Sequence, residues 1–303
     1  MPRPFRFGAS LLTSAPADEW RARCRRVEEL GYDVLLVPDH LGMVAPFPAL
    51  VAAADATERP QVGTFVLNAG FWNPTLLARE VTTTDDLTGG RLELGLGTGY
   101  VEAEHDTAGL PFGSPGERVD HLRRTIEELG RLLDAANRRV PLLLGGNGDR
   151  MLRLTAEHAD IAAFAGASLE PGSTTGRLAP VDAAEFGQRV ARYREFAAGL
   201  EEPAELNLLI QVVAVTDDPA SALRPLLDRR PDLTLEQVLD LPVMLVGTLD
   251  EITAKLRALR DRYGFSYLTV LEPYMEAFAP VAEELRRNPL ATPAVPLLGS
   301  PHE

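Results

Sequence analysis

Two side chains that can exchange protons, Asp39 and His40, follow a short apolar segment near the start of the chain. The segment Val-Leu-Leu-Val at 34–37 is typical of a strand buried on both faces, and Pro38 separates it from the pair. His40 can gain or lose a proton near neutral pH. Side chains of adjacent residues usually point apart, so we expect each to contact a ligand separately. The alternative is that Asp39 caps a loop and His40 lies on the surface.

A glycine-rich segment, Gly-Leu-Gly-Thr-Gly-Tyr at 95–100, is the second candidate site. Alternating glycines leave backbone N–H groups free of bulky side chains, so a flat or anionic ligand can approach closely. The dinucleotide-binding fingerprint fails, because Tyr100 stands where Gly or Ala is required and no helix opens there. A phosphate-binding P-loop fails because no Gly-Lys-Ser/Thr follows. The alternative is a plain tight turn.

A second glycine-rich segment, Gly-Gly-Asn-Gly at 145–148, precedes a predicted helix. The N–H groups at a helix start attract anions, and Arg150 or Arg153 can add positive charge toward a phosphate. Two aromatic residues, Phe71 and Trp72, follow the third predicted strand. They either form a wall for a flat ligand or anchor the loop that contains them.

Composition excludes several classes of function. The chain has 303 residues and a formal net charge of −14, so it lacks the basic surface that nucleic acid requires, and an anionic membrane would repel it. Its single cysteine, Cys24, allows no internal disulfide, and its spacing from Trp20 and Val27 predicts a buried helix face. No long apolar run opens the chain, so we expect no signal peptide or membrane span, and a cytoplasmic protein.

Metal and serine-hydrolase chemistry are not indicated either. The sequence has no His-x-His pair after the first predicted strand and no His-Glu-x-x-His motif. The acidic cluster at 102–106 is of a kind that is usually solvated, so we expect no metal. No Gly-x-Ser-x-Gly segment is present to form a nucleophile elbow.

The elements that must position these residues alternate between strand and helix patterns. The predicted strands are 5–12, 34–37, 62–67, 92–96, 140–144, 160–164, 206–215 and 267–271. The predicted helices are 18–30, 48–57, a helix that Pro74 opens, 117–136, 150–158, 183–198, 250–263 with Thr248 as its cap, and 275–287. Eight such units favour a closed (β/α)8 TIM barrel at 1–287, because no linker divides the chain into the two halves of a doubly wound fold.

Three long connections are predicted to be insertions at the C-terminal mouth of this barrel. Residues 101–116 and 166–180 are expected to form loops, and residues 217–242 are expected to hold extra helices. They would shape a substrate pocket. The tail at 288–303 contains several Pro and Gly residues and is expected to be loosely ordered.

Several segments together resemble a known family. They are Gly31-Tyr32-Asp33, Pro38-Asp39-His40, Asn73-Pro74 with Leu77-Ala78-Arg79-Glu80, Asp86 to Leu92, Gly95 to Gly99, Gly145 to Gly148, His158-Ala159-Asp160 and Val246 to Ile252. In this order and spacing, over most of the chain, they resemble the bacterial luciferase-like flavin/F420 superfamily, and most closely its F420-dependent oxidoreductases.

The resemblance implies a (β/α)8 barrel that holds coenzyme F420, or alternatively FMN, across its C-terminal mouth. It also implies a homodimer. The peptide between Phe65 and Val66 matches one that is often cis and bulges under the cofactor ring. The positions that it assigns to cofactor binding are Asp39, His40, Phe65, Val66, Asn68, Gly97, Thr98, Gly99, Gly145, Gly146, Asn147 and Gly148.

The mechanism that follows is hydride transfer between C5 of the deazaflavin and a small organic substrate, by reduction of an activated C=C or C=N bond. His40 or Tyr100 would supply the proton, and Asp39 would orient the cofactor ring or the histidine. Tyr100 stands where sugar-phosphate dehydrogenases of this superfamily have an acidic residue, which argues against a sugar-phosphate substrate. The alternatives are an FMN-dependent monooxygenase that uses O2 and a barrel that binds a cofactor without turnover.

Overall fold

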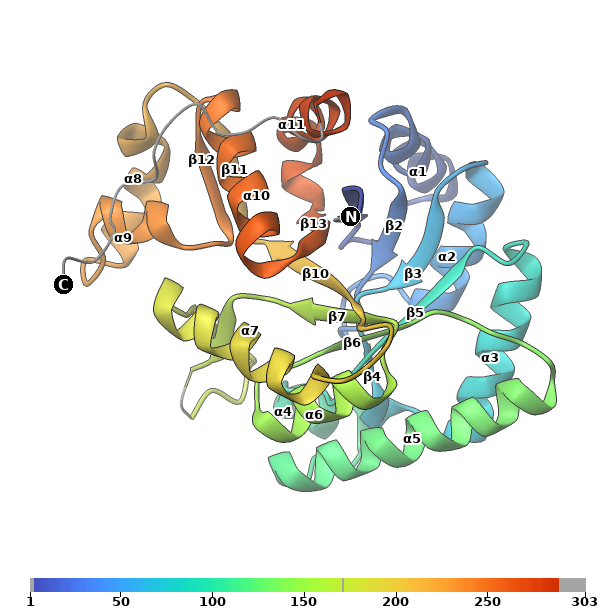
Figure 1. Ribbon diagram of the computed structural model, residues 1–303. Coiled ribbons are helices and arrows are strands. Elements are labelled where there is room, and N and C mark those ends of the chain that lie inside the picture. Colours follow the sequence, from blue (N-terminus) through green and yellow to red (C-terminus); the bar gives the residue numbers. More distant parts are fainter. Residues whose placement is uncertain (1–2, 171, 289–303) are drawn as a thin grey trace.

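Parallel strands close into a barrel surrounded by helices (Figure 1). The structure, a computed structural model, describes residues 3–170 and 172–288. The barrel strands are β1 (Arg6–Ser10), β2 (Val34–Val37), β3 (Gln61–Thr64), β4 (Leu67–Asn68), β5 (Leu92–Gly97), β6 (Leu142–Gly145), β7 (Ile161–Phe164), β10 (Glu205–Ile210) and β13 (Phe265–Leu271). The strands β3 and β4 share one position, and pairing of β3 with β5 closes the sheet. The predicted (β/α)8 TIM barrel is confirmed.

The helices that follow these strands cover the outside of the barrel (Figure 1). They are α1 (Ala17–Glu29), α2 (Pro46–Ala56), α3 (Pro74–Leu87), α5 (Pro115–Ala135), α6 (Asp149–His158), α7 (Ala183–Ala197), α10 (Leu249–Tyr263) and α11 (Met275–Arg287). Local sequence explains several of their ends. Thr248 and Glu251 form the capping box that begins α10, and Gly89 and Gly90 adopt positive φ where α3 ends.

Apolar side chains form an outer layer between strands and helices and a smaller inner cluster. The inner cluster consists of Val34, Leu36, Leu143, Ile161, Ala163 and Tyr267. Cys24 belongs to the outer layer with Trp20 and Val27, which confirms its predicted burial. Burial raises the pKa of the Cys24 thiol to about 12, so it stays protonated and unreactive.

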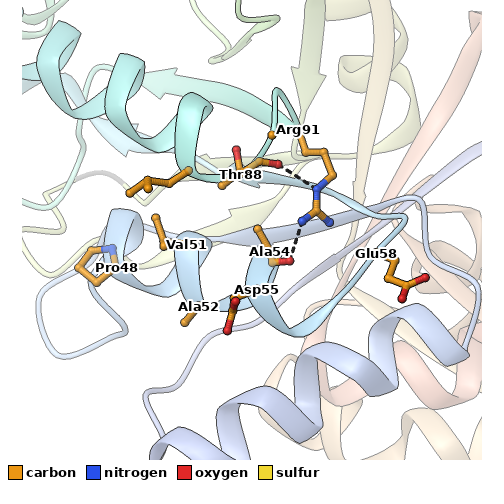
Figure 2. Close-up of a pocket in the computed structure, with 10 residues that line it drawn as sticks. Pro48, Val51, Ala52, Ala54, Asp55, Glu58, Thr88 and Arg91 are labelled. Atoms are coloured by element: carbon orange, nitrogen blue, oxygen red, sulfur yellow. Dashed lines mark hydrogen bonds between the residues drawn. The ribbon is translucent and has the colours of Figure 1, made fainter.

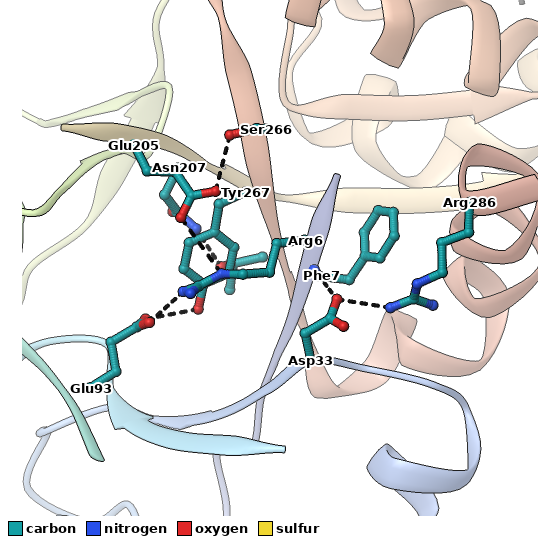
Figure 3. A network of polar contacts seen from close by, with 10 residues as sticks. Arg6, Phe7, Asp33, Glu93, Glu205, Asn207, Ser266, Tyr267 and Arg286 are labelled. Carbon is teal, nitrogen blue, oxygen red and sulfur yellow. Dashed lines mark hydrogen bonds and ion pairs between the residues drawn. The ribbon is translucent and has the colours of Figure 1, made fainter. Parts of the chain in front are cut away.

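A buried polar network fills the N-terminal end of the barrel, opposite the mouth (Figure 3). Arg6 and Glu205 begin their strands, and Arg6 forms ion pairs with Glu93 and, at 3.6 Å, with Glu205. The Tyr267 hydroxyl donates to Glu93 at 3.1 Å, and the Arg6 guanidinium lies 4.1 Å from the centroid of the Tyr267 ring. Burial raises the pKa of Glu93, while the charge of Arg6 opposes that rise. This end of a barrel serves stability.

The structure corrects two expectations about the insertions and one about a barrel strand. Residues 101–116 are not only a loop, because they contain the helix α4 (Glu102–Ala108). Residues 166–180 contain an antiparallel hairpin, β8 (Ala167–Leu169) with β9 (Leu178–Pro180). The predicted strand at 206–215 is split, because the chain leaves the barrel after β10 and continues as β11 (Val212–Val215).

The second half of that split strand belongs to a separate small sheet. It pairs in parallel with β12 (Met244–Gly247), and the helices α8 (Pro219–Arg229) and α9 (Leu235–Asp240) connect the two (Figure 1). Extra helices at 217–242 are therefore confirmed. Apart from Asn288, the tail at 288–303 lies outside the described residues, so the division into a barrel and a loose tail stays a prediction. No helix in the described part of the chain is long and apolar enough to span a membrane.

Candidate functional site

The predicted site residues come together at the C-terminal ends of neighbouring strands. The pairings place β2 beside β3, β3 and β4 beside β5, and β5 beside β6. Asp39 and His40 follow β2, Tyr100 follows β5, and the segment 145–148 begins at the end of β6. All of these ends lie at one mouth, which is where TIM barrels carry their chemistry.

His40 contacts two groups that come from the segment after β5. Its Nδ1 atom lies 3.0 and 3.1 Å from the two carboxylate oxygens of Glu104, which belongs to α4. The Tyr100 hydroxyl lies 3.4 Å from Nε2 on the other side of the ring, and the two rings meet edge to face. Burial and the charge of Glu104 raise the pKa of Tyr100, so its hydroxyl is a proton donor rather than a base.

Asp39 and His40 contact different groups, as expected for adjacent side chains. Its Oδ2 atom accepts from the backbone N–H of Asn68 at 3.1 Å and from the Trp72 indole at 3.4 Å. The expectation that Asp39 orients the histidine is therefore corrected, because the carboxylate on the imidazole is that of Glu104. Burial raises the pKa of Asp39. Its position near a cofactor ring stays a prediction.

The glycines of the first glycine-rich segment face the strand beside them. A Cβ on Gly95 would lie 2.0 Å from the Thr64 carbonyl oxygen, and one on Gly97 would lie 2.8 Å from a Val66 methyl group. The Phe65–Val66 peptide is cis, as the resemblance implied. Local packing alone therefore requires glycine at both positions, and a plain turn does not describe the segment.

The third glycine of this segment makes room for Asn68. A Cβ on Gly99 would lie 2.2 Å from Asn68 Oδ1, and the φ of Gly99 is +69°. The Asn68 amide nitrogen also lies 2.9 Å from Nε2 of His105, which is buried. The acidic cluster at 102–106 is thus not simply solvated, because Glu104 and His105 both hold partners at the mouth.

A Cβ atom would fit without a clash at two of the glycines in the second glycine-rich segment. A Cβ on Gly148 would meet nothing within 4 Å, and one on Gly145 would make only ordinary contacts. Gly146 packs against Met151, and Asn147 donates to the Ala167 carbonyl at 2.7 Å. The N-terminus of α6 has no side-chain cap at Gly148, so its N–H groups remain available to an anion.

The arginines expected at this segment are engaged elsewhere. Arg150 forms an ion pair with Asp120, and the Arg153 guanidinium lies 4.3 Å from the centroid of the Phe196 ring. Arg189 of α7 is close instead, because it donates to the same Ala167 carbonyl, at 3.3 Å. Sequence reasoning missed Arg189, because this residue lies 41 positions after the segment's last glycine, in another predicted helix.

The two aromatic residues after β3 anchor their loop. The Trp72 indole donates to Asp39 and meets the Phe47 ring edge to face at 5.3 Å between centroids. The Phe71 ring lies 5.0 Å from the His105 imidazole, again between centroids. Of the two interpretations left open by the sequence, these contacts favour anchoring over a wall for a ligand.

The hairpin of β8 and β9 covers Tyr100. The backbone N–H of Ala103 donates to the Thr174 carbonyl at 3.1 Å. A Cβ on Gly176 would lie 3.0 Å from the Tyr100 ring and 2.5 Å from a Val101 methyl group. The connection between β8 and β9 therefore lies directly on the ring of the proposed proton donor.

The surface has one hollow beside this site and a larger one away from it. One of about 340 Å³ is bordered by Asp39, His40 and Trp72 under the loop between β2 and α2. A larger one of about 860 Å³ lies away from the mouth, between the ends of α2 and α3, where Arg91 bonds to Ala54 and Thr88 (Figure 2). Among the described residues, no group of three or more His, Cys, Asp or Glu side chains is placed to hold a metal ion.

Comparison with known proteins gives one family and two kinds of relative. Residues 3–235 match the model of the luciferase-like monooxygenase family. The chain is 36% identical over 118 residues to an F420-dependent glucose-6-phosphate dehydrogenase of Intrasporangium calvum, covering 35% of each chain. It is 30% identical over 119 residues to the oxygenase component of a flavin-dependent trigonelline monooxygenase of Acinetobacter baylyi, covering 37% of this chain and 33% of that one.

Solved structures extend the likeness to nearly the whole chain. The coenzyme F420-dependent tetrahydromethanopterin reductase of Methanopyrus kandleri superposes with a TM-score of 0.70, at 17% identity, over 93% of this chain and 98% of that one. The matches to those two curated relatives span about a third of their length. At 17% sequence identity, the superposition with the reductase shows a shared fold and nothing more.

Proposed function

Because the chain belongs to the luciferase-like monooxygenase family, we propose that it is an oxidoreductase that uses coenzyme F420. It transfers a hydride between C5 of the deazaflavin and a small organic substrate, by reducing an activated C=C or C=N bond. The observation that carries this proposal is the contact between His40 and Tyr100 at the mouth, beside a glycine-rich strand end. Relatives named as F420-dependent support the choice of cofactor.

The residues at the mouth fit a cofactor that consists of a flat ring and a phosphate tail. Gly148 leaves open space at the uncapped start of α6, where backbone N–H groups would hold the phosphate. Phe65 and Val66 are partly exposed above the inner cluster, where they would support the ring. Gly97 ends β5, and Thr98 and Gly99 follow it directly.

The chain's own residues supply the proton that this reaction needs. The cofactor, when bound, supplies the hydride. His40 and Tyr100 hold an exchangeable proton between Nε2 and the phenol oxygen, and the connection between β8 and β9 covers the Tyr100 ring. Asp39 fixes the backbone of Asn68 and the Trp72 indole, so it keeps the floor of the mouth in place.

A second candidate function, an FMN-dependent monooxygenase that uses O2, is favoured by the charges around α6. Three arginines near this helix are matched by carboxylates: Arg150 by Asp120, Arg189 by Glu185 and Arg192 by Asp149. FMN carries one phosphate, whereas F420 carries glutamate carboxylates beyond its phosphate, so FMN asks for less positive charge. Binding of a cofactor without turnover is the third possibility.

One titration separates these proposals. Purified protein is titrated with F420 and with FMN, and bound cofactor is followed by absorbance and fluorescence. The proposal expects F420 to bind, and it expects the reduced form of the cofactor to be reoxidised by an enone or an imine on the protein. Tight FMN binding without F420 binding, together with substrate-dependent oxygen uptake, would overturn it in favour of the monooxygenase. Binding of F420 without turnover across an enone and imine panel would support the third possibility.

We also propose a homodimer, on the strength of the resemblance to this family. Leu87, at the end of α3, is 64% exposed, and it borders the larger hollow together with Val51 and Ala52 of α2. We propose Leu87 as one contact of this dimer, because a large apolar side chain this exposed gains by being covered.

A further inference from the structure

The Glu104 carboxylate contacts two neighbouring residues of the loop after β2, the His40 ring and the Leu41 backbone. Both of its carboxylate oxygens lie within 3.1 Å of Nδ1, and one of them also accepts the backbone N–H of Leu41 at 3.2 Å. Its side chain is 15% exposed. The carboxylate therefore meets the imidazole in one fixed orientation, although 64 residues separate the two in sequence.

This contact decides which ring nitrogen of His40 exchanges protons. An ionised carboxylate can only accept hydrogen bonds, so Nδ1 must carry its hydrogen toward Glu104. That holds for the neutral ring and for the protonated ring alike. Nε2 is then the nitrogen that gains and loses a proton, and its neighbour at 3.4 Å is the Tyr100 hydroxyl.

We propose that Glu104 is a positioning residue that holds His40 as its Nδ1–H form, so that protons reach the substrate from His40 through the Tyr100 hydroxyl. This rests on the proposed function for the reaction itself. Hydride adds to one end of the C=C or C=N bond, the π bond breaks, and the other end takes the proton of the Tyr100 hydroxyl. The phenol oxygen takes the Nε2 proton of protonated His40, which ends as the neutral Nδ1–H form. The reduced deazaflavin is the reductant, and it loses two electrons with the hydride.

Asp39 does not compete for this role. Its carboxylate accepts from the Asn68 N–H and the Trp72 indole. The raised pKa of Tyr100 agrees with a phenol that keeps its proton until the substrate takes it. The proposal therefore rests on three groups from two segments of the chain: His40 after β2, and Tyr100 and Glu104 after β5.

The first test needs no cofactor. Protein labelled with ¹⁵N-histidine is studied by long-range ¹H–¹⁵N NMR, with the His40 signals assigned from a His40→Gln variant. The wild type is expected to show the Nδ1–H form, and Tyr100→Phe is expected to shift Nε2 alone. Glu104→Gln keeps an acceptor and should keep the form, whereas Glu104→Ala should give a mixture of forms. Asp106→Ala, on the exposed side of the same helix, should change nothing.

An Nε2–H form in the wild type, or an unchanged spectrum in Glu104→Ala, would overturn the proposal. If Glu104→Ala fails to fold, the proposal is still tested by the Nδ1–H form expected of His40 in the wild type and by the shift of its Nε2 signal in Tyr100→Phe. These readouts are independent of whether F420 or FMN binds, so failure of the proposed function is seen separately, in the titration of the wild type.

The second test uses turnover of 2-cyclohexen-1-one with reduced F420. Glu104→Ala is expected to lower kcat about 10- to 100-fold with little change in KM, because Glu104 acts only through His40 and so contributes at most part of the roughly 10²- to 10⁴-fold effect of a positioned acid. Added formate should restore part of the loss, and Asp106→Ala should stay within about twofold of the wild type. An unchanged kcat in Glu104→Ala, on a wild type that turns over, would overturn the proposal.

Discussion

Replacing Gly95 with alanine tests why the first glycine-rich segment needs its glycines. In the structure a Cβ at this position would lie 2.0 Å from the Thr64 carbonyl oxygen and 3.0 Å from a Val66 methyl carbon. Thr64 also joins the two strands through its hydroxyl, which accepts from the Gly95 N–H and donates to the Gly95 carbonyl, both at 2.8 Å. The added carbon therefore strikes backbone that two hydrogen bonds hold in place.

The expected loss of stability follows from these contacts. The Thr64 carbonyl must move by more than about 1 Å to reach an ordinary contact distance, and forcing an extra carbon into a packed site typically costs about 1–3 kcal/mol. Straining two neutral hydrogen bonds adds about 0.5–1.5 kcal/mol each. Gly95→Ala should therefore lower the free energy of unfolding by about 2–6 kcal/mol.

Equilibrium unfolding in urea measures this effect, and Gly130→Ala is the matched control. Gly130 lies in the middle of α5 with nothing within 4 Å of its Cβ position, so alanine there should raise stability by about 0.5–1 kcal/mol. A Gly95→Ala protein within about 0.5 kcal/mol of the wild type would refute the argument, since the cost of overpacking alone is larger.

Three further predictions concern the mouth and the outer surface. Gly145→Ala should fold as stably as the wild type, because its Cβ would lie 3.7 Å from Ala163. In the cofactor titration it should bind F420 about tenfold more weakly, because a glycine in a strand marks a close approach of a ligand. Equal affinity would place the cofactor ring elsewhere. Burial raises the pKa of Asp39, so the wild type loses stability relative to Asp39→Asn as pH rises from the ordinary aspartate range through the raised value. Urea unfolding of both proteins from pH 4 to 7 should therefore show the difference in unfolding free energy move in favour of the variant. A difference that stays constant over this range would contradict the argument. Leu87→Arg should turn a dimer into a monomer in light scattering, whereas an unchanged mass would move the interface away from α3.

Regular periodicity predicted the barrel well. Strands such as Val34–Val37 and helices such as Met275–Arg287 have the predicted bounds, because their apolar spacing matches one type of element throughout. The strand expected at 206–215 looked continuous because its residues are almost all apolar. Its division at Gln211, whose N–H bonds to the Val243 carbonyl, depends on a segment that is distant in sequence.

The site was predictable where the residues lie directly after strands, as His40 and Tyr100 do. Glu104 was assigned to a solvated cluster, because only the folded chain shows that α4 brings it to His40. Arg189 was missed for the same reason. The glycines at 95–99 were interpreted as room for a ligand, and the structure shows that Gly95 and Gly97 first make room for Thr64 and Val66.

Titration of the purified protein with F420 and with FMN tests the central claim most directly. If the mouth beside His40 and Tyr100 is a deazaflavin site, F420 binds, and its fluorescence changes to saturation at one equivalent per chain. Tight binding of FMN with no response to F420 would contradict the claim.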